Sequence, residues 1–136
     1  MTAYLLDTHT VLWLINSPAR VPAGIREELV QPETIRLISP VVAMEAATKY
    51  RLGKLSQAAP LVDHWKLALA ELAATETPVT YGQGITAGTL PWPHRDPWDR
   101  LLAAQAMDLG VPLVTADAVF TGLAEACPTF RLAWQG

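Results

Sequence analysis

The residues of this sequence best suited to chemistry are acidic side chains that follow short apolar runs. Asp7 comes directly after residues 3–6, and Asp117 comes shortly after residues 112–115. If both runs are parallel strands, their carboxyl ends meet at one edge of a sheet, where open α/β folds bind ligands. Carboxylate oxygens are the ligands that Mg²⁺ and Mn²⁺ prefer. The two residues therefore predict a cation site at that edge.

Three further acids belong to segments with helical patterns. Glu45 follows an apolar stretch, and a charged side chain rarely faces a core unless something pairs it. Asp96 precedes Pro97, so we expect Asp96 to cap a helix and to accept a hydrogen bond from the backbone N–H of Trp98 or Asp99. Asp99 then projects from the first turn and is the better ligand. The predicted catalytic and metal-binding residues are Asp7, Glu45, Asp99 and Asp117, with Asp96 as a supporting residue.

Each acid also has a purely structural interpretation. Asp7 and Asp117 stand where an aspartate caps the following helix, which stabilises that helix by about 1 kcal/mol. Glu45 and Lys49 are four residues apart and would form a surface ion pair on a helix. Asp99 in a first turn is favoured by the helix dipole alone. These alternatives stay open for each residue taken singly, and only the complete set favours a metal site.

The elements that must position these acids alternate between strands and helices. The apolar spacing predicts strands at 3–6, 35–38, 78–80, 112–115 and 130–134, and helices at 8–15, 22–30, 40–52, 60–72 and 97–109. Gly82, Gly84 and Gly88 indicate helix and turn punctuation between two of them. Such alternation predicts right-handed crossovers and a mainly parallel sheet. We therefore expect an α/β fold, a three-layer α/β/α sandwich in a single domain spanning residues 1–136.

Composition and charge narrow the classes of function. Hydrophobic residues make up 51% and charged residues 17% of the 136 residues, which argues against disorder. We expect a cytoplasmic protein without a membrane partner, because neither a secretory leader nor an apolar run of roughly 20 residues is visible. The formal net charge of −3 argues against simple phosphate binding. It is compatible with a nuclease in which cations neutralise the acids.

Other catalytic chemistries fit less well. The three histidines, His9, His64 and His94, lack the spacing of a histidine metal motif, and neither a nucleophile elbow nor a phosphate-binding P-loop occurs. A haloacid dehalogenase-type phosphatase requires a second aspartate two residues after the first. His9 occupies that position after Asp7. That class of phosphatase is therefore disfavoured.

Two sets of residues are candidates for contacts with partners. Basic side chains near the acids could contact phosphates and are Lys49, Arg51, Lys54, Arg95 and Arg100. Apolar residues at helical spacing could face a protein partner and are Leu61, Trp65, Leu69 and Leu72. We expect the apolar stripe to contribute partly to a surface for a protein partner or for a second copy of the chain, since exposed apolar patches usually mark interfaces.

Four segments carry a resemblance to a known family. YLLDTHTVLW, SPVVAMEAATKYRLGKL, HRDPWDRLLAAQA and LVTADAVF are similar, in order and spacing, to the motifs of PIN-domain ribonucleases. The strongest likeness is to the VapC toxins of type II toxin–antitoxin pairs. Met44 and Trp98 stand where the family often has aromatic residues and Phe, respectively, and both keep the bulk of the side chain.

The resemblance implies an activity, a cofactor and partners. The family's four acids fall on Asp7, Glu45, Asp99 and Asp117, and Thr115 matches a hydroxyl that supports the site. The implied reaction is endonucleolytic RNA cleavage by a water that Mg²⁺ or Mn²⁺ activates, with 5′-phosphate and 3′-hydroxyl products. The implied partners are an RNA substrate, a cognate antitoxin and a second copy in a homodimer. A PIN-like module that binds without cleaving is the remaining alternative.

Overall fold

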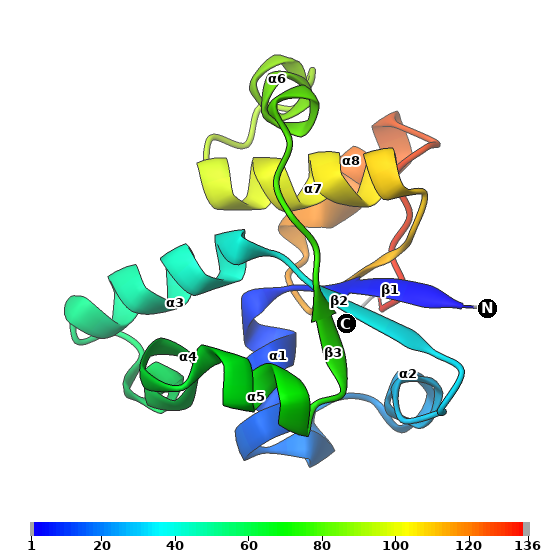
Figure 1. Ribbon diagram of the computed structural model, residues 1–136. Helices are drawn as coiled ribbons and strands as arrows, with labels where there is room; N and C mark the ends of the chain where they lie inside the picture. Colours follow the sequence, from blue (N-terminus) through cyan, green and yellow to red (C-terminus); the bar gives the residue numbers. More distant parts are fainter. Residues whose placement is uncertain (1, 135–136) are drawn as a thin grey trace.

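The computed structural model describes residues 2–134, and its centre is a four-stranded parallel sheet (Figure 1). The strands are β1 (Ala3–Leu6), β2 (Ile35–Ile38), β3 (Ala74–Glu76) and β4 (Leu113–Val114), in the order β3-β2-β1-β4. In the register, Tyr4 of β1 pairs with Arg36 of β2, and Leu5 pairs with Leu113 of β4. The carboxyl ends of β1 and β4 are therefore neighbours.

Helices connect the strands and cover the sheet. The α-helices are α1 (Thr8–Asn16), α2 (Ala23–Leu29), α3 (Pro40–Arg51), α4 (Ala59–Asp63), α5 (Trp65–Glu71), α6 (Tyr81–Thr89), α7 (Pro97–Leu109) and α8 (Val119–Ala126). Short 3-10 turns lie at Pro18–Arg20 and Ser56–Ala58. Within residues 2–134, no helix has the length and apolar character that crossing a membrane requires.

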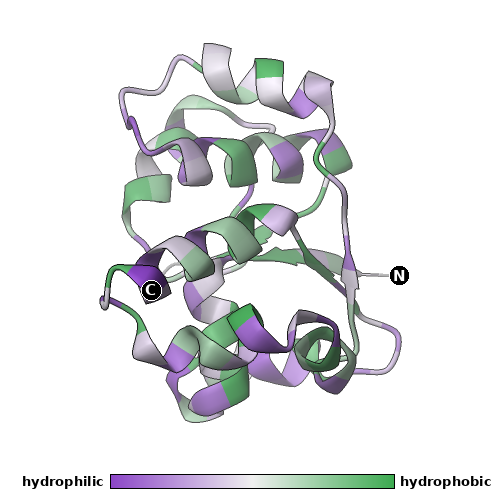
Figure 2. Cartoon of the chain, turned by 60° about the vertical axis from the view of Figure 1, so that its left-hand side comes forward, coloured by the Kyte–Doolittle hydropathy of each residue, from purple (hydrophilic) through white to green (hydrophobic). Residues whose placement is uncertain are grey.

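The sheet separates two hydrophobic cores. Tyr4 and Leu6 belong to the core that α1, α2, α4 and α5 cover, whereas Leu5 belongs to the core beneath α7 and α8. This alternation follows from the two-residue period of a strand. Helices lie on both sides of the sheet (Figure 1), and the strands between them are largely hydrophobic (Figure 2). The predicted three-layer α/β sandwich with a parallel sheet is confirmed.

The third strand lies earlier than the sequence indicates. We predicted a strand at 78–80, but β3 spans Ala74–Glu76 and pairs with β2, and Thr77 donates one more backbone hydrogen bond to Ile38. Pro78 has no N–H with which to continue the ladder. Thr80 instead begins α6 with a capping box that it shares with Gln83. The glycines of this stretch therefore belong to a helix.

The segment 60–72 is two helices rather than one. His64, with φ −139° and ψ 53°, interrupts it between α4 and α5. Leu61 and Leu69 are nevertheless buried, and Trp65 and Leu72 pack against the same core. Leu61 and Leu69 thus belong to the chain's own core, whereas Trp65 and Leu72 are only half-buried. A partial contribution of the stripe to a partner surface stays a prediction.

The C-terminal segment is also less regular than predicted. In place of a strand at 130–134, Leu132 forms a single parallel bridge with Leu113. The backbone N–H of Leu113 donates to Arg131, and that of Ala133 donates to Leu113. The segment therefore extends the sheet beside β4 by one residue pair only.

Two glycine substitutions test the end of α7 and the helical conformation of α6. Gly110 ends α7 with φ 66°, a conformation that an L side chain adopts only with strain, whereas a Cβ on Gly84 within α6 meets no atom within 4 Å. We expect Gly110→Ala to lower the free energy of unfolding by about 1 kcal/mol. We expect Gly84→Ala to raise it by about 0.5–1 kcal/mol. Urea unfolding measures both, and destabilisation by Gly84→Ala would contradict the helix α6.

Candidate metal centre

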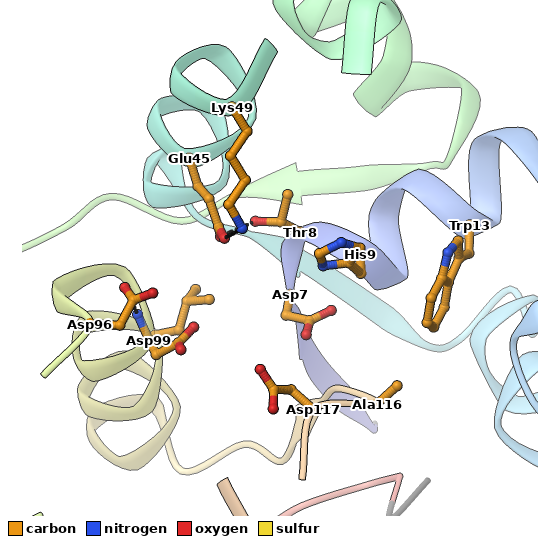
Figure 3. Close-up of a pocket in the computed structure, with 11 residues that line it drawn as sticks. Asp7, Thr8, His9, Trp13, Glu45, Lys49, Asp96, Asp99, Ala116 and Asp117 are labelled. Carbon is orange, nitrogen blue, oxygen red and sulfur yellow. Dashed lines mark hydrogen bonds and ion pairs between the residues drawn. The ribbon is translucent and has the colours of Figure 1, made fainter. Parts of the chain in front are cut away.

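The acids gather in a cavity at the carboxyl ends of β1 and β4. The cavity has a volume of about 320 Å³. Its walls come from the start of α1, one side of α3, the first turn of α7 and the turn after β4 (Figure 3). Its charged lining residues are Asp7, Glu45, Lys49, Asp96, Asp99 and Asp117. All four predicted ligands and Asp96 therefore face one space on the same edge of the sheet.

Asp7 combines a structural role with a place in the cavity. Its carboxylate caps α1 by accepting from the backbone N–H of Thr10 at 2.8 Å. The side chain is only 8% exposed. Burial raises the pKa of Asp7 above its ordinary value, while hydrogen bonds from Thr115 and Thr10 act in the opposite direction. The capping alternative is thus correct, and it fixes the carboxylate at the cavity wall.

Glu45 enters the cavity from α3 and is held by two donors. The Thr8 hydroxyl donates to Oε1 at 2.6 Å, and the Lys49 ammonium donates to Oε2 at 2.6 Å. Glu45 is only 6% exposed. The ion pair expected between Glu45 and Lys49 therefore exists, but it lies in the wall of the cavity rather than on an open helix face. The hydroxyl of Thr8, 37 positions away in sequence, was not predicted to contribute.

Asp96 and Asp99 divide two roles at the start of α7. Asp96 caps the helix, because its Oδ1 accepts from the backbone N–H groups of Trp98 at 2.9 Å and Asp99 at 3.3 Å. This confirms the hydrogen bonds predicted for the cap. Asp99 projects from the first turn, and its Oδ2 accepts from His94 Nε2 at 2.7 Å.

The pKa of Asp99 is raised to about 6, and burial is the main cause. The His94 hydrogen bond lowers the pKa, whereas the charges of Asp96 and Glu45 raise it. Burial and neighbouring carboxylates both disfavour the charged form. The cavity is therefore a place where a cation would relieve electrostatic strain.

Asp117 closes the acidic ring from the turn after β4. It is exposed, and its Oδ1 accepts from the backbone N–H of Val119 at 3.0 Å. The hydroxyl of Thr115 accepts from the backbone N–H of Asp117 at 3.0 Å, and Thr115 is itself buried. Thr115 thus connects Asp117 to Asp7 through its one hydroxyl.

The donor atoms suit a hard divalent cation. Among the described residues, His94, Asp96 and Asp99 offer ligand atoms that all lie within 4.8 Å of one another. Asp7, Glu45 and Asp117 contribute carboxylates from the facing walls of the same cavity (Figure 3). Oxygen-rich sets of this kind are typical of Mg²⁺ and Mn²⁺, and thiolates, which favour softer metals, do not line the cavity.

The basic residues do not all surround the cavity. Lys49 lines it, whereas Arg51, Lys54 and Arg95 are exposed and lie outside its lining. Arg100 has a different role from the phosphate contact that we expected. Its guanidinium donates to the backbone carbonyls of Ala87, Leu90, Trp92 and His94. Arg100 therefore holds the segment between α6 and α7 in place.

Removing one charge from the metal-free cavity should stabilise the fold. The folded-state pKa of Asp99, about 6, exceeds the ordinary 3.8. The folded state therefore binds this proton more tightly, and stability falls as the pH rises from 4 to 6. Asp99→Asn removes the charge but keeps an oxygen for His94. In EDTA at pH 7.5 we expect the variant to melt a few degrees above the wild type, with the difference vanishing toward pH 4.

Thermal unfolding of both proteins between pH 4 and pH 8 measures this effect. Glu33→Gln, which changes an exposed acid outside the cavity, is the control for a general effect of net charge. A constant difference between Asp99→Asn and the wild type at every pH would contradict the electrostatic explanation.

Comparisons with solved structures identify similar folds. A VapBC2 complex from Rickettsia felis bound to promoter DNA has 19% identity and a TM-score of 0.68, with 96% of this chain and 97% of that chain covered. A DNA-bound VapBC from Salmonella typhimurium has 19% identity and a TM-score of 0.65, with 97% of each chain covered. A toxin–antitoxin complex from Klebsiella pneumoniae has 14% identity and a TM-score of 0.59, with 98% and 99% covered.

Sequence comparison gives the family. No curated protein sequence matches this chain. Residues 4–126 match the family model described as the PIN domain. This match includes all but the first residue of β1, the whole of β4 and every acidic residue that lines the cavity. The protein belongs to the PIN-domain family.

Proposed function

We propose that this protein is a metal-dependent endoribonuclease and the toxin of a toxin–antitoxin pair. The observation that carries the proposal is the convergence of Asp7, Glu45, Asp99 and Asp117 on one cavity of a PIN domain. These acids come from four segments that are far apart in the sequence, two of them helices and two of them turns after strands, so helix capping alone does not account for their meeting. A protein that only bound RNA through phosphates would need basic side chains in this place.

Mg²⁺ or Mn²⁺ is the cofactor in this proposal, held by the same four carboxylates. Asp7 is nearly inaccessible to solvent and accepts hydrogen bonds from the uncharged groups of Thr10 and Thr115, and burying such a charge without a counterion is costly. When bound, the cation supplies a nucleophilic water near neutral pH and stabilises charge on the phosphate oxygens. Hydrolysis by that water leaves a 5′-phosphate and a 3′-hydroxyl.

The residues of the chain keep the carboxylates in place for this reaction. Thr10 and Thr115 hold Asp7, and Thr8 holds Glu45. Each of these hydrogen bonds restricts the carboxylate to one orientation, so little reorganisation is needed when the substrate binds. Lys49 is the basic residue in the cavity wall, and its ammonium is the donor best placed for a phosphate oxygen. Exposed Arg51, Lys54 and Arg95 are candidate contacts for the RNA farther along its backbone.

The proposed partners follow the structural neighbours. Those neighbours are toxin–antitoxin complexes, and by analogy we infer that a cognate antitoxin binds this chain and covers the acidic cavity. A homodimer and a cytoplasmic location belong to the same proposal. Co-expression with the adjacent reading frame, followed by copurification, tests the antitoxin directly.

Substituting each of the two acids at the start of α7 tests whether Asp99 is the metal ligand and Asp96 only the helix cap. We expect Asp99→Asn to lower the rate of RNA cleavage by roughly 100-fold or more, because it removes a charge that holds the cation. Asp96→Asn should keep most of its activity, since asparagine caps a helix as well as aspartate does. Cleavage of one RNA at saturating Mn²⁺ measures both. Equal losses would show that Asp96 is also a ligand, and selective loss in Asp96→Asn would overturn the assignment.

Cation binding should also stabilise the folded protein. At a free Mn²⁺ concentration about 100 times the dissociation constant, the gain in free energy of unfolding is about 2.7 kcal/mol. We expect Asp7→Asn, which preserves the α1 cap, to lose most of this gain. Thermal unfolding with Mn²⁺ and with EDTA measures it. Asp63→Asn, an exposed acid at the end of α4, should behave like the wild type. Stabilisation of the Asp7 variant equal to that of the wild type would contradict the proposed site.

A further inference from the structure

We propose that His94 is a positioning residue, whose imidazole orients the Asp99 carboxylate toward the cation. This inference rests on the proposed function, because it assumes that Asp99 binds the metal. His94 lies before α7, outside the set of acids, and its ring does not line the cavity. Although His94 belongs to the group of possible ligands with Asp96 and Asp99, its Nε2 is already engaged by Asp99 Oδ2, so it acts through Asp99.

The geometry at Asp99 is that of an oriented ligand. His94 Nε2 donates to Asp99 Oδ2 at 2.7 Å, a short distance for a hydrogen bond to a carboxylate. Within residues 2–134, the second oxygen, Oδ1, has no hydrogen-bond donor and remains available to the cavity. One oxygen is thus fixed while the other is free. Partners of this kind orient metal ligands in many sites.

The imidazole itself lies against a row of tilted aromatic rings. The ring centroids of His94 and Trp92 are 4.9 Å apart, and Trp92 is only 8% exposed. The centroids of Trp92 and Phe120 are 5.6 Å apart, and those of Phe120 and Phe130 are 6.0 Å apart. These rings therefore connect the histidine to the core beneath α7 and α8.

Backbone contacts fix the segment that carries His94. Arg100, one residue beyond Asp99 on α7, donates to the carbonyls of both Trp92 and His94. Arg100 therefore ties the backbone of the His94 segment to the first turns of α7, the helix that also carries Asp99. A side chain that only filled space on Trp92 would not need its Nε2 aimed at the carboxylate.

Three variants test whether His94 positions the Asp99 carboxylate or only packs on Trp92. His94→Leu keeps bulk on Trp92 but has no donor, and His94→Gln offers an amide N–H at about the position of Nε2. His64→Leu removes an exposed histidine at the α4–α5 junction and is the control. The readout is the dissociation constant for Mn²⁺, measured by calorimetric titration of the full chain, together with the melting temperature in EDTA.

We expect His94→Leu to weaken Mn²⁺ binding about 10- to 100-fold, the usual effect of losing a residue that orients a metal ligand. His94→Gln should recover most of the affinity, and His64→Leu should match the wild type. If His94→Leu does not fold, His94→Asn replaces it, because its amide is too short to occupy the Nε2 position. Its affinity should then fall by the same factor.

Specific results would overturn the inference. Wild-type affinity in His94→Leu would show that the imidazole only packs on Trp92. Equal loss in His94→Gln and His94→Leu would show that the ring itself is required, as for a direct metal ligand. Absence of Mn²⁺ binding in the wild type would instead refute the proposed function on which the inference rests. The two failures are therefore distinguishable.

Discussion

The structure depends on keeping several carboxylates close together in a poorly solvated cavity. Asp7 and Glu45 are almost completely buried, and Asp99 has a pKa raised to about 6 by burial and by its acidic neighbours. Buried charges are tolerated only where donors or counterions compensate them. Here each carboxylate receives at least one hydrogen bond, and Lys49 supplies one positive charge inside the cavity wall. The other carboxylates keep a net negative charge in the cavity, which a bound cation would neutralise.

The fold satisfies this requirement with short, local devices. Parallel pairing of β1 with β4 places the segments that carry Asp7 and Asp117 side by side. The first turns of α1 and α7 supply backbone N–H groups for Asp7 and Asp96, so capping and site formation are the same contacts. Two separate cores, one on each face of the sheet, hold these helix starts against the strand ends. Helix capping and the wall of the acidic cavity therefore use the same residues at this edge.

Sequence patterns predicted the parts of the site that depend on local chemistry. Strand ends and an Asp-Pro helix start are readable from neighbouring residues, and the acids at those positions do line one cavity. The Thr8–Glu45 hydrogen bond and the carbonyl contacts of Arg100 join residues that only tertiary packing brings together, so no local pattern indicated them. The glycines of α6 favour turns over helices, so the helix was not predicted there. Its clear signal in the sequence is the capping box of Thr80 and Gln83. Similarly, β3 was misplaced because its register is set by pairing with β2 rather than by its own residues.

We infer that one cation centre joins acids from the strand ends with an acid from α7. Anomalous diffraction from a crystal of the protein grown with Mn²⁺ tests this most directly. We expect an anomalous peak within the cavity, with oxygens of Asp99 and of at least one of Asp7, Glu45 and Asp117 at about 2.0–2.3 Å from the ion, the range for hard-cation coordination. A peak held by His94 and Asp96 alone, or a cavity in which Lys49 stays on Glu45 and Mn²⁺ binds elsewhere, would contradict it.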